Sequence, residues 1–130
     1  MSAPLRILIA DDHEPFRAML KSLLGTLGAE IVECRDGREA VQRFSEFAPD
    51  WVLMDIEMPQ LDGLTATRQI TAMSPRARVV IVTNYDDADL RAEADRAGAS
   101  DYVRKDNLMV LPGLLKRRMD SGSAPSKTLP

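Results

Sequence analysis

The chain has 130 residues, of which 45% are hydrophobic and 28% are charged. This balance is ordinary for a folded protein and argues against overall disorder, and the length suits one domain with a single hydrophobic core. A net charge of -3 gives no electrostatic reason to expect direct contact with nucleic acid or with an anionic membrane surface. We therefore expect one soluble domain, with any DNA contact made by a different domain.

The chain has one cysteine, Cys34, and one histidine, His13, which excludes an internal disulfide and a structural zinc site made of these residue types. A free cysteine is compatible with a reducing compartment, so we expect the protein in the cytoplasm. No apolar stretch is long enough to span a membrane, and the first residues lack the pattern of an export signal. We expect no membrane contact.

Short apolar runs alternate with amphipathic segments along the chain. The runs that predict buried strands are residues 5–10, 30–34, 52–55, 78–83 and 101–104. Apolar residues at helical spacing predict helices between these strands, at 15–27, 37–47, 64–73 and 87–97. In the first helix both Met19 and Leu20 are expected to face the core. Pro112-Gly113 interrupts the last helical segment, 107–119, so we expect a kink, or one short turn before a helix that starts near Pro112.

This alternation predicts an α/β fold: an open, five-stranded parallel sheet with helices on both faces, because consecutive parallel strands need crossover helices. Such sheets bind ligands at the carboxyl ends of their strands. The sequence places five polar residues at these ends: Asp11 and Asp12 after the first strand, Asp55 after the third, Thr83 after the fourth and Lys105 after the fifth. The second strand is expected to contribute nothing to this group.

Three carboxylates at one edge repel one another, so they stay ionised only when a cation joins them. Mg²⁺ prefers oxygen ligands, which makes Asp12 and Asp55 the predicted direct ligands, with Asp11 acting through water. An aspartate beside such an ion can attack phosphorus and form an acyl phosphate. Lys105 would offset charge on the phosphoryl oxygens, and Thr83 could donate a hydrogen bond to one of them. Each residue alone has an ordinary structural explanation, such as a solvated turn, so the prediction depends on their combination.

These motifs resemble the receiver domain of two-component response regulators. The residues that carry the resemblance are Asp11-Asp12, Asp55 with Met58-Pro59 and Asp62-Gly63, Thr83, and Tyr102 followed by Lys105. Asp11-Asp12-His13 and residues 102–106 further resemble the NarL/FixJ-type subfamily, whose members usually carry a carboxyl-terminal helix-turn-helix DNA-binding domain. The resemblance implies a flavodoxin-like (βα)5 sheet with strand order 2-1-3-4-5, a receiver domain at 1–120, and a flexible tail or start of a linker at 121–130.

The resemblance also implies a role for each matching residue. It makes Asp55 the acceptor of a phosphoryl group from a sensor histidine kinase or a phosphotransfer protein. The residues implied for the magnesium site are Asp11, Asp12, Asp55 and the backbone carbonyl of Glu57, and those implied for the switch are Thr83, Lys105 and Tyr102. In the family pattern, Glu57 and Tyr85 flank the path of water to the phosphoryl group.

The function implied is therefore a phosphoacceptor, with no enzyme activity beyond self-phosphotransfer and autodephosphorylation. Its output would be transcription through a DNA-binding domain outside these residues, or protein contact as a stand-alone receiver, and a phosphorylation-dependent homodimer is compatible with either. A phosphohydrolase with an aspartyl-phosphate intermediate is less favoured, since 130 residues leave little room for a cap over a substrate. Asp101 and Pro112-Gly113 depart from the family pattern, so the partner surface near them is not assigned.

Overall fold

The structure is a computed structural model that describes residues 4–121, with side chains as far as Lys116. Strands and α-helices alternate along this part of the chain. The strands are β1 (Arg6–Ala10), β2 (Glu30–Cys34), β3 (Trp51–Met54), β4 (Val79–Thr83) and β5 (Asp101–Arg104). The helices are α1 (Glu14–Leu24), α2 (Gly37–Phe47), α3 (Gly63–Met73), α4 (Ala88–Ala97) and α5 (Leu111–Ser121), with 3-10 turns η1 (Gly25–Leu27) and η2 (Lys105–Val110).

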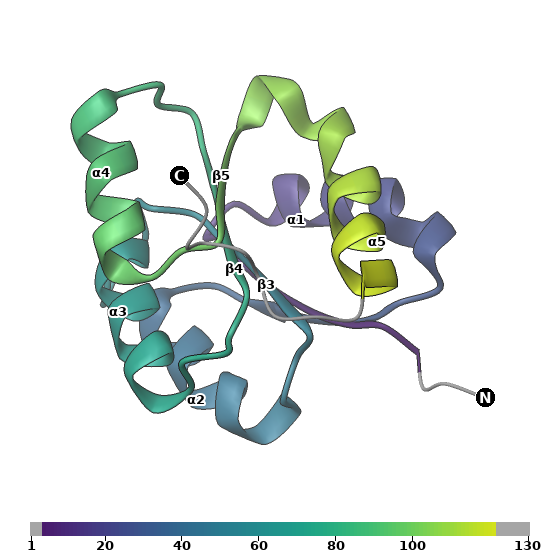
Figure 1. Cartoon of the computed structure of the whole chain (residues 1–130), viewed down its shortest axis with the longest axis horizontal. Helices are drawn as coiled ribbons and strands as arrows, with labels where there is room; N and C mark the ends of the chain where they lie inside the picture. The colour runs from purple at the N-terminus through teal and green to yellow at the C-terminus, as the bar shows by residue number, and fades with distance from the viewer. Residues whose placement is uncertain (1–3, 122–130) are drawn as a thin grey trace.

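The five strands form one parallel sheet in the order β2-β1-β3-β4-β5. Helices α1 and α5 cover one face, while α2, α3 and α4 cover the other (Figure 1). The predicted fold class and strand order are both confirmed. The parallel arrangement places the carboxyl ends of all five strands along one edge of the sheet.

The sheet has a hydrophobic core on each face, because successive side chains of a strand point to opposite sides. In β1, Ile7 and Ile9 pack with α1 and α5, whereas Leu8 and Ala10 pack with the helices of the other face. All four residues of β3 are buried in the same alternating way. This central strand, enclosed on both sides, leads directly into Asp55.

Helix α1 differs from the prediction at one core position and at its end. Met19 is 48% exposed, because the stripe that meets the sheet consists of Phe16, Leu20 and Leu24 at a spacing of four residues. The expectation that Met19 faces the core was wrong. The regular helix ends at Leu24, and the last turn before Gly28 is the 3-10 turn η1.

The interruption expected in the last helical segment is present. The 3-10 turn η2 precedes α5, and Asn107 within it has non-helical dihedral angles. Helix α5 starts at Leu111, so Pro112 lies in its first turn, where a missing amide hydrogen costs little. Ser121, the first residue of the predicted tail, still belongs to α5, and the rest of that tail, 122–130, lies outside the described residues.

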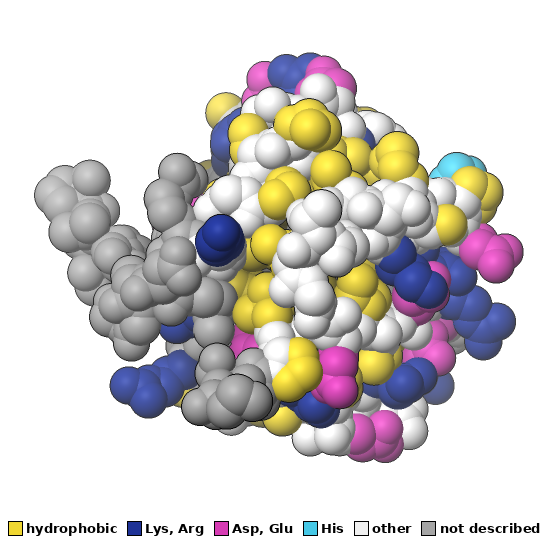
Figure 2. Space-filling model, turned by 90° about the vertical axis from the view of Figure 1, so that its right-hand side faces the viewer, with side chains coloured by type: hydrophobic (Ala, Val, Ile, Leu, Met, Phe, Trp, Pro, Cys, Tyr) yellow, Lys and Arg dark blue, Asp and Glu magenta, His cyan; other side chains and the backbone are white. Residues whose placement is uncertain are grey.

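The side of the molecule formed by α1 and α5 carries hydrophobic side chains between charged ones (Figure 2). Exposed hydrophobic residues include Met19 of α1 and Met109 and Val110 of η2. Among residues 4–121, no helix combines the length and the apolar character needed to cross a membrane.

Candidate functional site

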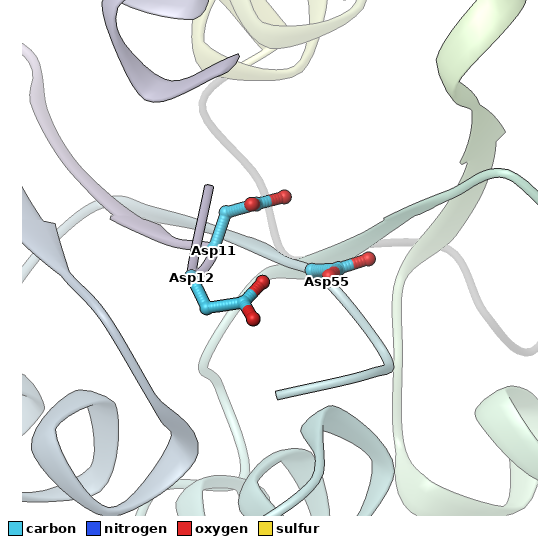
Figure 3. A group of neighbouring side chains, drawn as sticks. All are labelled: Asp11, Asp12 and Asp55. Carbon is cyan, nitrogen blue, oxygen red and sulfur yellow. The ribbon is translucent and has the colours of Figure 1, made fainter. Parts of the chain in front are cut away.

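The ends of β1 and β3 bring three aspartates together. The strands pair in register at Ala10 and Met54, and the backbone amide of Asp55 donates to the carbonyl of Ala10 at 2.9 Å. Consequently the residues that follow the two strands, Asp11 and Asp55, lie side by side. One oxygen from each carboxylate of Asp11, Asp12 and Asp55 lies within 4.8 Å of the others, and the side chains converge on the same space (Figure 3). Asp11 is 1% exposed and Asp55 is 8% exposed, whereas Asp12 is open to solvent.

Lys105 reaches this group from the end of β5. Its Nζ lies 2.8 Å from Oδ2 of Asp11 and 3.6 Å from Oδ1 of Asp55. The same nitrogen lies 4.2 Å from the centre of the Phe16 ring, which gives the ammonium an aromatic face as well. One ammonium against three carboxylates leaves an excess of negative charge in a pocket made of oxygen donors. This donor set fits Mg²⁺, which prefers carboxylate and water ligands.

Burial and neighbouring charge also control the protonation of Asp55. Burial, and after it the nearby carboxylate of Asp11, raise the pKa of this carboxyl to about 7 from an ordinary value of 3.8. Lys105 and the backbone amide of Ile56 act in the opposite direction but do not cancel the rise. Without a cation, Asp55 therefore holds its proton far more tightly than an exposed aspartate does. A bound cation would favour the ionised form.

Thr83 lies at the end of β4 and is buried at the wall of the same pocket. The pocket has a volume of about 600 Å³. It is lined by Asp11, Asp12, His13, Phe16, Met19, Asp55, Glu57, Thr83, Asn84, Tyr85 and Lys105. All five residues that the sequence placed at the strand ends therefore meet in one pocket.

Glu57 and Tyr85 join the two loops beside this pocket. The hydroxyl of Tyr85 donates to Oε1 of Glu57 at 3.0 Å, although the two residues are 28 positions apart. This hydrogen bond raises the pKa of the Tyr85 hydroxyl, because the carboxylate favours the protonated phenol. Both side chains line the pocket that contains Asp55. Their effect on the access of water, and the backbone carbonyl of Glu57 as a ligand, stay predictions.

The loop after Asp55 is held close to that residue by Gly63. A Cβ at Gly63 would lie 1.8 Å from the backbone oxygen of Asp55, so no other residue fits there without movement of the backbone. The amide of Gly63 donates to the carbonyl of Ile56 at 2.7 Å. Asp62 then caps α3 by accepting from the amide of Thr65 at 2.9 Å. Together these contacts hold the loop that carries Glu57.

Tyr102 contacts the β4–α4 loop rather than the carboxylates. Its hydroxyl donates to the backbone carbonyl of Tyr85 at 2.8 Å, and the guanidinium of Arg91 lies 4.4 Å from the centre of its ring. Its backbone pairs with Ile81, two residues before Thr83. The half-buried position expected from sequence is confirmed. A change of its rotamer on phosphorylation stays a prediction.

The residues near the site that were not anticipated from the sequence include Phe16, whose ring faces Lys105 in the pocket, and Arg17, which is buried beside Asp11. Nη1 of Arg17 donates to the backbone carbonyl of Asp11 at 2.7 Å, and Nε donates to Glu33 of β2 at 2.8 Å. Among the described residues, β2 adds no side chain to the lining of the pocket, as expected, and Glu33 contacts the site only through Arg17. An arginine directly after a core aromatic, early in the helix that follows Asp12, was the available signal.

Comparisons with known proteins agree with this geometry. Residues 7–111 match the family model described as the response regulator receiver domain. The chain is 38% identical over 101 residues to a chemotaxis protein CheY of Thermotoga maritima, covering 77% of this chain and 84% of that protein. It is 40% identical over 105 residues to the regulatory protein AtoC of Escherichia coli, covering 81% of this chain but only 23% of AtoC.

A solved structure gives the same result in three dimensions. A two-component response regulator of the LuxR family from Aurantimonas sp. superposes with a TM-score of 0.83 at 31% sequence identity. The superposition covers 94% of this chain and 89% of that chain. Similarity thus extends over the sheet and its helices as well as over the short motifs.

Proposed function

This chain belongs to the response regulator receiver domain family, and we propose that Asp55 is the residue that accepts a phosphoryl group. The observation that carries the proposal is the convergence of Asp55 with two further carboxylates and the ammonium of Lys105 in one pocket. Phosphoryl transfer asks a protein mainly for positioning and for charge neutralisation, and this pocket supplies groups for both.

The proposed reaction is a displacement at phosphorus. An oxygen of the ionised Asp55 carboxylate forms a bond to phosphorus while the bond between phosphorus and the donor atom breaks, and the donor atom keeps the electron pair. For a phosphohistidine donor that atom is a ring nitrogen, and for acetyl phosphate it is an oxygen. The phosphoryl group therefore moves without any other reactant, and the product is an acyl phosphate on Asp55.

The pocket residues prepare this step in different ways. Asp11, Asp12 and Asp55, with the backbone carbonyl of Glu57, would hold Mg²⁺, which supplies positive charge against the phosphoryl oxygens when it is bound. Lys105 lies 3.6 Å from Asp55, close enough to bind an oxygen of the group that arrives there. The hydroxyl of Thr83 is available to donate to another of these oxygens.

We propose that phosphorylation then changes the surface around Tyr102. A phosphoryl group adds negative charge and acceptor oxygens beside Thr83, and movement of Thr83 would pull on the β4–α4 loop. The hydroxyl of Tyr102 donates a hydrogen bond to the carbonyl of Tyr85 in that loop, so when the loop moves either this hydrogen bond breaks or the Tyr102 ring moves with the loop. A Tyr102 ring whose position and hydrogen bond are both unchanged by phosphorylation would count against the switch.

The proposed partners are a sensor histidine kinase or a phosphotransfer protein as donor, and an output that responds to the changed surface. An output in transcription through a DNA-binding domain is supported by the names of two similar proteins. They are the transcriptional regulatory protein LnrK of Bacillus subtilis and a DNA-binding response regulator of the LuxR family from Staphylococcus aureus. The similarity to CheY supports the alternative of a receiver that acts through protein contact alone. We further propose that the chain belongs to the NarL/FixJ-type subfamily and that its receiver domain spans residues 1–120. A homodimer that forms on phosphorylation is compatible with either output.

The test is incubation of the chain with Mg²⁺ and acetyl phosphate or phosphoramidate, followed by intact mass measurement. The wild type is expected to gain one phosphoryl group, and Asp55→Ala is expected to gain none. Asp89→Asn is the matched control, because Asp89 is an exposed carboxylate on α4 outside the pocket, and it should be labelled like the wild type. Labelling of Asp55→Ala to the same extent would refute Asp55 as the acceptor.

A further inference from the structure

Arg17 is a buried cation outside the group of residues that would contact the phosphoryl group or the metal. It lies in the second turn of α1 and is 8% exposed. Its guanidinium has two contacts, one to the backbone carbonyl of Asp11 at 2.7 Å and one to Oε1 of Glu33 at 2.8 Å. Burial of an arginine is costly unless such contacts compensate it, so this placement calls for an explanation.

With the contact from Arg17, the backbone amide, the backbone carbonyl and both carboxylate oxygens of Asp11 all have hydrogen-bond partners. The backbone amide of Asp11 donates to the carbonyl of Cys34 at 3.0 Å. Its Oδ1 accepts from the amide of His13 at 2.8 Å, and its Oδ2 accepts from Lys105 at 2.8 Å. Its carbonyl accepts from Arg17. That carbonyl belongs to the peptide joining Asp11 to Asp12, so its direction sets the direction of Asp12.

We propose that Arg17 is a positioning residue for the cation site, acting through the carbonyl of Asp11 on the placement of the Asp12 carboxylate. The inference extends the proposed function, because it concerns the same Mg²⁺ site. Asp12 is the exposed member of the three aspartates and has the least packing of its own to hold it. Its approach to Asp55 thus depends on the backbone of the turn, and Arg17 is the side chain that ties this turn to α1 and β2.

The role requires a guanidinium. A planar guanidinium presents several N–H groups in fixed directions, so Arg17 reaches the carbonyl of Asp11 and the carboxylate of Glu33 at once. A lysine ammonium is a single point of charge on a flexible chain, and it cannot hold both groups in the same geometry. Arg17→Lys therefore keeps the charge and removes the double contact.

Glu33 makes the arrangement compatible with a cation site. Its carboxylate pairs with Arg17 at 2.8 Å and with Lys21 at 2.9 Å, and these two hydrogen bonds hold the pKa of Glu33 below its usual range. The charge of Arg17 is therefore matched on the side away from Asp11. This pairing limits the repulsion that a bare guanidinium would exert on a nearby metal ion.

The experiment measures Mg²⁺ affinity of the full chain by isothermal titration calorimetry. Arg17→Lys is expected to weaken Mg²⁺ binding by roughly tenfold, the lower end of what loss of such a supporting contact costs a metal site. Lys21→Met is the matched control, because it removes the other cation paired with Glu33 but leaves the contact with Asp11 intact. Its Mg²⁺ affinity should equal that of the wild type.

A second readout separates positioning from a merely structural role. Urea unfolding without Mg²⁺ gives the stability of each variant, and labelling by acetyl phosphate over a range of Mg²⁺ concentrations gives the half-saturating concentration and the rate at saturation. Positioning predicts a higher half-saturating concentration for Arg17→Lys, with a rate at saturation close to that of the wild type. Lower stability with an unchanged Mg²⁺ affinity would overturn the proposal.

Glu33→Ala provides a second route if Arg17→Lys does not fold. It keeps the guanidinium of Arg17 but removes its hydrogen bond to β2, so Glu33→Ala, like Arg17→Lys, should weaken Mg²⁺ binding. If Arg17→Lys and Glu33→Ala fold and bind Mg²⁺ as tightly as the wild type, the positioning role of Arg17 is overturned, but the proposed function is not. Failure of the wild type to bind Mg²⁺ overturns the metal site of the proposed function itself.

Discussion

Replacement of Asp55 by asparagine is expected to stabilise the domain at neutral and higher pH when Mg²⁺ is absent. In the folded state the pKa of Asp55 is raised to about 7, mainly by burial and then by Asp11, whereas the ordinary value is 3.8. Between these two pH values the folded chain binds more protons than the unfolded chain. The contribution of Asp55 to stability therefore falls as the pH rises through this window, and stays at its least favourable value above it.

The size of the effect follows from the shift. The difference between 3.8 and about 7 is roughly three pKa units, and each unit corresponds to about 1.4 kcal/mol, which gives an upper value of about 4 kcal/mol. Water in the pocket screens part of this, so we expect Asp55→Asn to gain between about 1 and about 4 kcal/mol at about pH 8. Asparagine removes the charge but keeps the shape, and Lys105 keeps Asp11 as its partner at 2.8 Å.

The assay is urea unfolding of both proteins in EDTA at several pH values. The difference in unfolding free energy should be largest at about pH 8 and should shrink towards zero as the pH falls to about 4 and below, where Asp55 becomes protonated in the unfolded state as well. Glu93→Gln, which changes an exposed carboxylate of α4, should show no such gain. Addition of Mg²⁺ should stabilise the wild type more than Asp55→Asn, so the difference in unfolding free energy between the two proteins should become smaller. This reasoning would be refuted if Asp55→Asn were no more stable than the wild type at about pH 8, or if the difference in stability grew as the pH fell.

Three further predictions concern the packing and charge around the site. Gly63→Ala should destabilise the domain by about 3 kcal/mol in urea unfolding, because its Cβ would meet the carbonyl of Asp55. Gly25→Ala, whose Cβ would have no atom within 4 Å, should change stability little, and equal effects of the two substitutions would argue against the close approach at Gly63. Leu20→Ala should cost about 3 kcal/mol and Met19→Ala less than about 1 kcal/mol, and the reverse order would contradict the orientation of α1. Lys105→Met should slow labelling by acetyl phosphate by roughly 100-fold at saturating Mg²⁺, and an unchanged rate would exclude a part for its ammonium in the transfer.

The alternation of strands and helices, and the residues at the strand ends, could be predicted from the sequence because each depends on a local pattern. The order of the strands was implied by the resemblance to receiver domains. Apolar runs such as the one before Asp55 are short and uninterrupted, which is typical of strands covered on both faces. Parallel strands then place their polar end residues at one edge whatever the details of packing. For this reason Asp11, Thr83 and Lys105 could be assigned to one site although they are far apart in the chain.

The contacts that support the site depend on tertiary structure alone. The sequence shows that α1 is amphipathic, but only the packing angle of the helix decides that Met19 is exposed and that Arg17 is buried between Asp11 and Glu33. The hydrogen bond between Tyr85 and Glu57 likewise joins two loops, of which the one that carries Glu57 is held by the close approach at Gly63 and the capping of α3.

Local patterns therefore determined which polar residues lie at the ends of the strands, since strand ends follow from hydrophobic periodicity. Tertiary structure decided which side chains hold them in place and how far burial shifts the protonation of Asp55, since both depend on distances between segments that no local pattern specifies.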